Sequence, residues 1–455
     1  MARGAGRRKH SRIPGLDIRA RGEHGFSVGP IAVARLSEGL FAQALRLARL
    51  AGRGHMGVIA TAPDIRIVYL GRGLRGFGDG FATIILPAYL SAIGYGPAEI
   101  GVVLTASLLG TAAFTLAIGA IVPRLDLRTL MLAGAALMAL TGLAFPNVQH
   151  IVFIAFVAFA GTINPSTGDL GVLVPLEHTM LARTAADAER THVFARYSLI
   201  GALSMAAGTL AAATPDFLTR MDRTDAFRAM FYAYASLGMV CALLYRHLQH
   251  AHISEQKPAA ALGPSRDIVY KLAALFSLDA FAGGFVVQSL LALWLFERFD
   301  LSVSAAGLFF FWAGTLSAFS YPVAAWLARR VGLVNTMVFT HIPSSLFLIL
   351  AAFSSHLYLT LGLLLLRAAL SQMDVPTRTS YVMAVVTPEE RAAAASVTAV
   401  PRSLASAIGP TFAGVLLTTA FTGLPLIVCG TLKIAYDIAL LFSFRHIRPP
   451  EETQP

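Results

Sequence analysis

The twenty residues from His247 to Arg266, HLQHAHISEQKPAAALGPSR, divide this chain into two long apolar parts. Their histidine, glutamine, lysine and proline content is typical of a solvated connection. Six apolar runs precede this stretch and six follow it, several of them near the roughly 20 residues that cross a bilayer's hydrocarbon core. We expect helices at 67–91, 98–121, 129–146, 151–173, 197–214 and 227–246, and then at 268–296, 304–327, 335–354, 357–377, 396–418 and 425–444.

The composition indicates that the bilayer is the solvent of both parts. Of the 455 residues, 56% are apolar and only 13% are charged, and the mean hydropathy is +0.66. Soluble domains typically carry about 25% charged residues. We therefore predict an all-α membrane protein with twelve transmembrane helices in two pseudo-symmetric six-helix bundles.

The domain prediction places six-helix bundles at 67–246 and 267–445, a cytoplasmic linker at 247–266 and a cytoplasmic tail at 446–455. The remaining segment, 1–66, is a basic cytoplasmic extension that we expect to be disordered, unless translation starts at Met56. It holds twelve Lys and Arg against four acids, so it accounts for about +8 of the formal charge of +11. It has neither the apolar region and cleavage site of a signal peptide nor the aromatic pattern of a nucleic-acid-binding fold. We expect no nucleic acid as a partner.

Basic residues in the loops indicate the orientation, because Lys and Arg concentrate on the cytoplasmic side. The loops at 92–97, 147–150, 355–356 and 419–424 contain none, and only 215–226 departs from the pattern, with two arginines among three aspartates. The opposite loops contain Arg124, Arg128, Arg183, Arg190, Arg196, Arg246, Lys257, Arg266, Arg329, Arg330 and Arg391. Both termini should be cytoplasmic. Richness in Ala, Gly and Arg is typical of a GC-rich bacterial genome, so we expect the cytoplasmic (inner) membrane.

The two parts repeat each other at an offset of about 200 residues. The string DGFA at 79–82 recurs as DAFA at 279–282. Further matches in the same order pair Gly101 with Gly307, Arg124 with Arg330, Glu189-Arg190 with Glu390-Arg391, and Gly208 with Gly409. Duplicated halves are expected in a transporter whose substrate site lies between them.

The loop after the second run resembles the signature loop of the major facilitator superfamily, G-x-x-x-D-R-x-G-R-[RK]. Here it reads GAIVPRLDLR, in which Arg124 and Arg128 match and a proline replaces the acid. The second-half copy keeps Arg330 and Gly332. The resemblance covers about residues 66–445 and implies a twelve-helix secondary transporter with these four residues in gating loops.

Two further motifs of this family occur here in displaced positions. Arg367 followed by Gln372 looks like the family's membrane-embedded arginine motif, which is usually noted in the fourth helix. The string IGPTFAG at 408–414 is similar to the Gly-Pro string that marks drug and proton antiporters in their fifth helix. Asp374 and Arg378, toward the cytoplasmic end of the tenth helix, are further gate candidates, and a snorkelling or loop-bracing role is the alternative. Uptake of a metabolite and efflux by an antiporter both stay open.

Charged residues within a span cost at least about 2.5–3.5 kcal/mol each on insertion scales, so each needs a reason. Arg72, Arg75 and Asp79 are spaced i, i+3 and i+7 and share one face of the first span. At about 1.5 Å per residue, Asp79 lies roughly 18 Å along that span, near mid-membrane. We predict that these three residues serve substrate binding or proton coupling. The alternative is that Arg75 and Asp79 only neutralise each other.

Asp279 repeats Asp79 in the seventh span, where the one basic residue nearby on its own helix is Lys271, two turns earlier. We predict an unpaired acid that exchanges protons, with structural hydrogen bonding as the alternative. Gln288, nine residues on, is a candidate hydrogen-bonding group for substrate. In the last span we expect Lys433 and Asp437 to pair with each other at i and i+4.

Four intramembrane arginines would make the transport path positive and favour an anionic or zwitterionic substrate, because guanidinium groups match carboxylate and phosphate. They are Arg72, Arg75, Arg367 and Arg378. Most of the twelve histidines fall in loops and termini, and no HExxH, GxSxG or P-loop string occurs. We predict no metal, cofactor or catalytic residue. The expected function is alternating-access transport of a small organic solute, coupled to protons, by a monomer; a membrane-embedded enzyme and a channel or receptor are remote alternatives.

Overall fold

The computed structural model describes residues 63–121, 125–166, 171, 173–184, 190–250, 262–387 and 390–445. Within these residues every regular element is a helix. The chain from Thr61 onward forms one compact unit. Predictions for the N-terminal extension up to residue 62, for most of the linker, for the tail and for Arg124 lie outside the described residues.

The first half contains α2 Pro63–Ala92, α3 Pro97–Ile121, α4 Leu127–Ala144 with the 3-10 turn η2 Phe145–Asn147, α5 Ile151–Ala160, α6 Val174–Thr184, α7 Arg190–Ala211, α8 Thr214–Phe217 and α9 Arg223–Tyr245. The second half contains α10 Arg266–Gly284, α11 Gln288–Phe299, α12 Val303–Val331, α13 Leu333–Phe353, α14 Leu357–Ser371, α15 Asp374–Val385, α16 Arg391–Leu417 and α17 Leu424–Phe444.

Ten helical segments among the described residues are long and apolar enough to cross a membrane, and α5 is a shorter apolar helix. The 30-residue α2 is long enough but less apolar, because Arg72, Arg75 and Asp79 lie within it. These ten segments, together with α2 and α5, correspond one to one with the twelve expected runs. The prediction of an all-α membrane fold in two halves is confirmed.

The fourth, seventh and tenth expected spans differ from the prediction because each is interrupted. The run expected at 151–173 stops being helical at Gly161, whose backbone is extended, and α6 begins only at Val174. The seventh run is divided between α10 and α11 directly after the paired Gly283-Gly284, and the tenth between α14 and α15 at Gln372. Glycine and polar residues at these points weaken the helix. Apolar composition continues across each interruption, so composition alone did not indicate where the helices end.

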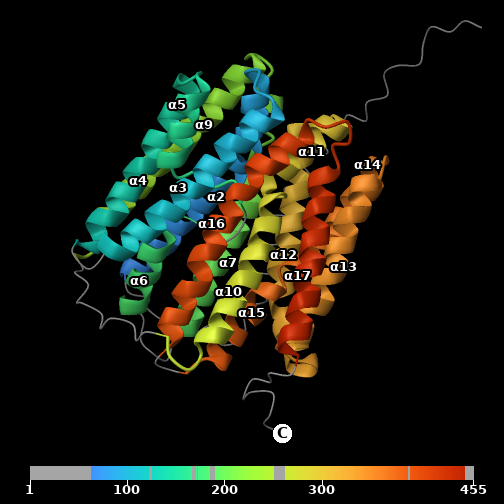
Figure 1. Cartoon of the computed structure of the whole chain (residues 1–455). Coiled ribbons are helices and arrows are strands. Elements are labelled where there is room, and N and C mark those ends of the chain that lie inside the picture. Colours follow the sequence, from blue (N-terminus) through green and yellow to red (C-terminus); the bar gives the residue numbers. More distant parts are fainter. Residues whose placement is uncertain are drawn as a thin grey trace, which may run out of the picture. The chain divides into compact units, whose positions relative to one another are not determined.

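Glycines permit close helix packing at matching places in the two halves. A Cβ on Gly208 of α7 would lie 2.0 Å from the Phe77 carbonyl oxygen of α2, and one on Gly409 of α16 would lie 2.5 Å from the Gly284 Cα of α10. Figure 1 shows α10 and α16 running together, and α2 packs along α7 in the same way in the first half. The sequence repeat therefore corresponds to a repeated packing contact.

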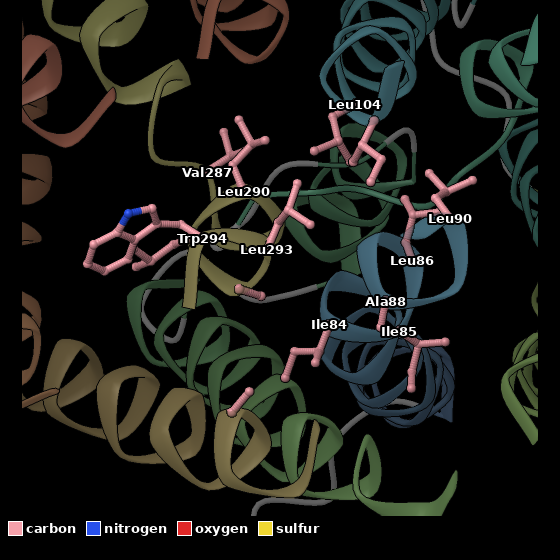
Figure 2. Packing of buried hydrophobic residues seen from close by; sticks show 14 of the residues in the cluster. Ile84, Ile85, Leu86, Ala88, Leu90, Leu104, Val287, Leu290, Leu293 and Trp294 are labelled. Carbon is pink, nitrogen blue, oxygen red and sulfur yellow. The ribbon is translucent and has the colours of Figure 1, made fainter. Parts of the chain in front are cut away.

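The halves meet where α3 packs on α16, α7 packs on α12, and α11 packs on α2. Gly101 of α3 lies against Gly414 of α16, and its sequence match, Gly307 of α12, lies against Thr209 of α7. A buried apolar core joins α2 and α3 to α11 (Figure 2), and its members include Ile84, Ile85, Leu86, Leu104, Leu290, Leu293 and Trp294.

Candidate functional site

The buried polar cluster of the first half, which we call the N-terminal cluster, is centred on Glu177 of α6. This side chain has no exposed surface. Arg75 forms an ion pair with it, and the hydroxyls of Tyr197 and Tyr245 donate to it at 2.5 and 2.6 Å. One carboxylate therefore satisfies three donors that come from α2, α7 and α9.

The interruption after α5 and two glycines bring these groups together. Because α6 is a separate helix, it lies against α2, α4 and α7 and turns Glu177 toward α2. A Cβ on Gly71 would lie 2.3 Å from the Tyr245 hydroxyl, and one on Gly201 would lie 2.2 Å from Arg72 Nε. Neither approach would be possible with a larger residue.

Asp79 lies one turn beyond Arg75 on α2 and accepts a hydrogen bond of 3.1 Å from the Tyr234 hydroxyl. The same hydroxyl lies 3.1 Å from Thr162 Oγ1, in the segment that follows α5. Within the described part of the chain Asp79 forms no ion pair. The alternative in which Arg75 and Asp79 neutralise each other is wrong, because Arg75 is engaged by Glu177 on another helix.

Asp279 of α10 is the centre of the corresponding C-terminal cluster. Lys433 Nζ of α17 lies 2.5 Å from its Oδ1, and Arg378 Nη1 of α15 lies 3.2 Å from its Oδ2. Arg378 also pairs with Asp374 at 3.0 Å. The prediction of an unpaired Asp279 is wrong, because its bases come from two distant helices, which spacing along α10 could not reveal.

His341 of α13 extends the C-terminal cluster to the last helix. Its Nδ1 lies 3.1 Å from both carboxylate oxygens of Asp437, and its Nε2 lies 3.3 Å from Lys433 Nζ. His341 and Asp437 are both buried. The expected pair of Lys433 with Asp437 is wrong, since each bonds a partner on another helix. A neutral imidazole can donate through Nδ1 to Asp437 and accept through Nε2 from Lys433, so His341 links Asp437 to the base that holds Asp279.

Gln288 lies at the junction between the halves. Its Nε2 donates to Thr83 Oγ1 at 2.9 Å, and the neighbouring Ser289 Oγ donates to the Thr83 carbonyl at 2.7 Å. The Ser289 amide also donates to the Pro165 carbonyl at 3.2 Å, in the segment after α5. Gln288 is thus engaged in an interdomain contact, and its predicted binding of substrate stays a prediction.

The loop residues that match the family motif contact only residues near their own half. Arg128 Nη1 is 2.8 Å from His250 Nε2, Arg330 stacks on the Trp326 ring at 4.4 Å, and Gly332 has a φ of 90° at the turn into α13. That positive φ favours glycine. The gating role of these residues stays a prediction, as does that of Arg367.

Three residues of the two clusters, and Arg402 on the neighbouring helix α16, were missed or misjudged in the sequence. Glu177 fell in a segment expected to be a loop. His341 and Arg402, by contrast, lie within the expected spans at 335–354 and 396–418, where the cost of a polar or charged group would have singled them out. Lys433 was noted but assigned to the wrong partner.

No group of three or more His, Cys, Asp or Glu side chains in the described ranges could hold a metal ion. Both cysteines, Cys241 and Cys429, are buried and unpaired with each other. The C-terminal cluster has the groups to exchange ion-pair partners and to pass a proton between carboxylate and imidazole.

The Major Facilitator Superfamily model matches residues 68–275 and 272–455 of this chain. The uncharacterized membrane protein YJR124C of Saccharomyces cerevisiae is 24% identical over 421 residues, which cover 84% of this chain and 94% of the yeast protein. No substrate comes from that relative.

Several solved transporters share the fold. An auto-inhibited POT family peptide transporter superposes with a TM-score of 0.67 at 12% identity, covering 87% of this chain and 99% of its own. The nucleoside transporter NupG gives 0.66 at 13%, covering 84% and 99%. An inward-facing, occupied bacterial homolog of the human lysosomal transporter Spinster gives 0.62 at 16%, covering 83% and 94%. At such identities the likeness is one of fold.

Proposed function

This chain belongs to the Major Facilitator Superfamily, and we propose that it moves a small organic solute by alternating access with protons as the coupling ion. Family and fold make it a membrane transporter and not an enzyme. The coupling ion, the solute and the direction of transport do not follow from family and fold, and they are proposals. One observation carries the coupling: Asp79 is an acid in the middle of α2 whose hydrogen bond comes from a hydroxyl and which, among the described residues, forms no ion pair with a base.

Asp79 can take up a proton without breaking an ion pair. Its partner Tyr234 can donate to the ionised carboxylate and accept from the protonated one, because a phenol does both. Protonation of Asp279, by contrast, would leave Lys433 and Arg378 facing a neutral group. Asp79 is therefore the first candidate for the proton site, and Asp279 is the second.

Alternating access is supported by the contacts between the halves. Hydrogen bonds across the interface in the described residues involve Thr83 with Gln288 and Ser289, Pro165 with Ser289, Thr105 with Thr411, and Asp216 with Ser304. All of them lie toward the end of the bundle where α2 connects to α3 and α11 to α12. A transporter closed at one end by such contacts opens that end when they break.

The basic loops favour an orientation in which both termini face the cytoplasm of a bacterial inner membrane. In this orientation the contacts between Thr83 and Gln288 close the outer side, and alternating access requires them to break. The protein acts as a monomer, because each chain supplies both halves of the path.

The proposal is tested with a pH jump across proteoliposomes that contain the wild-type protein, Asp79→Asn or Asp300→Asn. Internal pH is followed while organic anions and cationic drugs are added in turn. Asp300 is exposed and has a left-handed backbone that asparagine also adopts, so its variant is a matched control. We expect one compound to trigger proton movement in the wild type and the control and not in Asp79→Asn.

Unchanged proton movement in Asp79→Asn would reduce Asp79 to a structural residue and move the role to Asp279. Transport of a compound by the wild type without any proton movement would refute proton coupling itself.

A further inference from the structure

We propose that Arg402 on α16 binds an oxyanion group, a carboxylate or a phosphate, of the transported solute. The residue lies beside the C-terminal cluster and forms no ion pair in the described residues. That the bound anion is a transported solute rests on the proposed transport function. The binding itself can be measured without any gradient.

Arg402 is half-buried, and its Nε is buried without a hydrogen-bond partner. No carboxylate among the described residues lies within 4.0 Å of it. α16 packs on α10 and on α15, the helices that carry Asp279 and Arg378. Arg402 thus lies on a helix that adjoins the C-terminal cluster, near enough for Asp279, Asp374 and Arg378 to act on its charge.

The acids near Arg402 are already committed to other bases. Asp279 is held by Lys433 and Arg378, and Asp374 pairs with Arg378. The remaining acid, Asp437, contacts His341. If one of these acids moved to pair with Arg402, it would have to leave the partner that it now contacts.

A count of the interior charges of the second half leads to the same conclusion. The cations are Arg367, Arg378, Arg402 and Lys433, and the acids are Asp279, Asp374 and Asp437. These described residues comprise four basic and three acidic side chains, so the basic ones outnumber the acids by one. Arg367 on α14 likewise has no partner for its guanidinium among the described residues, so Arg367 and Arg402 are the two arginines without an acid.

An unpaired guanidinium within a membrane protein is costly, and such residues are usually functional. An arriving oxyanion would supply the missing negative charge, and the planar fork of arginine can hold two of its oxygens at once. The arginines of the first half are less suited, because Glu177 engages Arg75 and the Tyr197 ring covers Arg72 at 5.1 Å. The earlier expectation of a generally positive path therefore narrows to the second half.

The test uses the purified full chain in lipid nanodiscs and measures binding by the shift of its thermal unfolding midpoint. The probes are benzoate and phenyl phosphate, with benzamide and benzylamine as their neutral and cationic counterparts. The variants are Arg402→Ala, Arg402→Lys and, as the control, Arg298→Ala, which removes an exposed arginine at the end of α11. We expect the two oxyanions, and not their counterparts, to stabilise the wild type and the control. In Arg402→Ala the apparent affinity should fall about tenfold to a hundredfold. In Arg402→Lys it should fall less.

The unfolding midpoint of the ligand-free protein distinguishes a structural role of Arg402 from a binding role. Because Arg402 forms no ion pair with a described acid and adjoins the like charge of Arg378, its replacement by alanine should leave the unfolding midpoint unchanged or raise it. A fall in that midpoint, together with equal stabilisation of wild type and Arg402→Ala by the oxyanions, would overturn the proposal. So would a wild type that neither oxyanion stabilises. Loss of proton coupling in the proteoliposome experiment would leave this binding intact, so the two proposals fail separately.

Discussion

The two halves each carry a buried ion pair between their first and fourth helical regions, but the charges are exchanged. In the first half the base Arg75 is on α2 and the acid Glu177 is on α6. In the second half the acid Asp279 is on α10 and the base Arg378 is on α15. Glu177 and Arg378 are separated by 201 residues, the offset at which the halves repeat. In both halves this contact between the first and fourth helical regions holds a pair of opposite charges, although a different helix supplies the base.

The pairs also differ in how many partners they have. Glu177 alone neutralises Arg75 and is further fixed by two tyrosine hydroxyls. Asp279 is shared between Lys433 and Arg378, and Arg378 has a second acid. We infer that the N-terminal cluster is rigid, whereas the C-terminal cluster can exchange partners during transport.

The largest effect should come from Glu177→Gln. It leaves Arg75 buried without an acid, which costs about 3–5 kcal/mol when one partner of a buried pair is removed. Asp374→Asn should cost clearly less, because Arg378 keeps Asp279 as its acid. Unfolding midpoints of the purified variants in detergent measure both effects. Equal losses of stability in the two variants would refute the inference that the C-terminal cluster has a spare ion-pair partner and the N-terminal cluster has none.

The exchanged variant, Arg75→Glu with Glu177→Arg, tests whether the polarity of the first pair is arbitrary. It should recover about 1–3 kcal/mol relative to the sum of the two single variants, a coupling typical of residues in contact. The measurement is a double-mutant cycle on unfolding free energy. Additive losses would show that the tyrosines around Glu177 require an acid there.

The matched glycine contacts give an intermediate effect in both halves. A Cβ on Gly80 would lie 2.1 Å from the Met205 carbonyl oxygen, and one on Gly284 would lie 2.5 Å from that of Ser406. Alanine at either position should destabilise the protein by about 1–3 kcal/mol through overpacking. Gly362→Ala is the control, since nothing lies within 4 Å of the added carbon. It should be neutral or stabilising by up to about 1 kcal/mol. A loss confined to one half would mean that the packing repeat is not equivalent.

The smallest effect concerns Glu390, the repeat of Glu189, at the start of α16. Hydrogen bonds from Ser265 and from the Gly263 amide hold the pKa of Glu390 below its usual value. A depressed folded-state pKa adds stability above the unfolded value of about 4.3, and this contribution is lost as the pH falls through the folded pKa. Glu390→Gln should therefore lower stability slightly at neutral pH and not at pH 3. The pH dependence of the unfolding midpoint measures this, and a constant difference between the two proteins would exclude it.

The sequence predicted the spans and the two halves because a bilayer demands long apolar helices whatever their partners. Asp79 and Asp279 could be singled out on the same basis, since charge in a span needs a reason. What could not be predicted was pairing. Lys433 reaches Asp279 across 154 residues, and no spacing rule along one helix contains that contact.

Glu177 shows the second limit. The segment VPLEHTMLART at 174–184 is only weakly apolar, so it read as a loop after the fourth run. The chain forms a separate helix there because Leu176, Met180 and Leu181 bury one face against the first half. Tertiary packing supplied the helix that composition did not indicate.

The bond from the Ser289 amide to the Pro165 carbonyl gives this transporter a built-in isotope reporter. The amide belongs to the first residues of α11, which have no acceptor within their own helix. Its protection from solvent deuterium therefore depends on the other half of the molecule staying in place. Deuterium uptake at this one peptide group, followed by mass spectrometry, would report openings of that end of the bundle without an attached probe or a known solute.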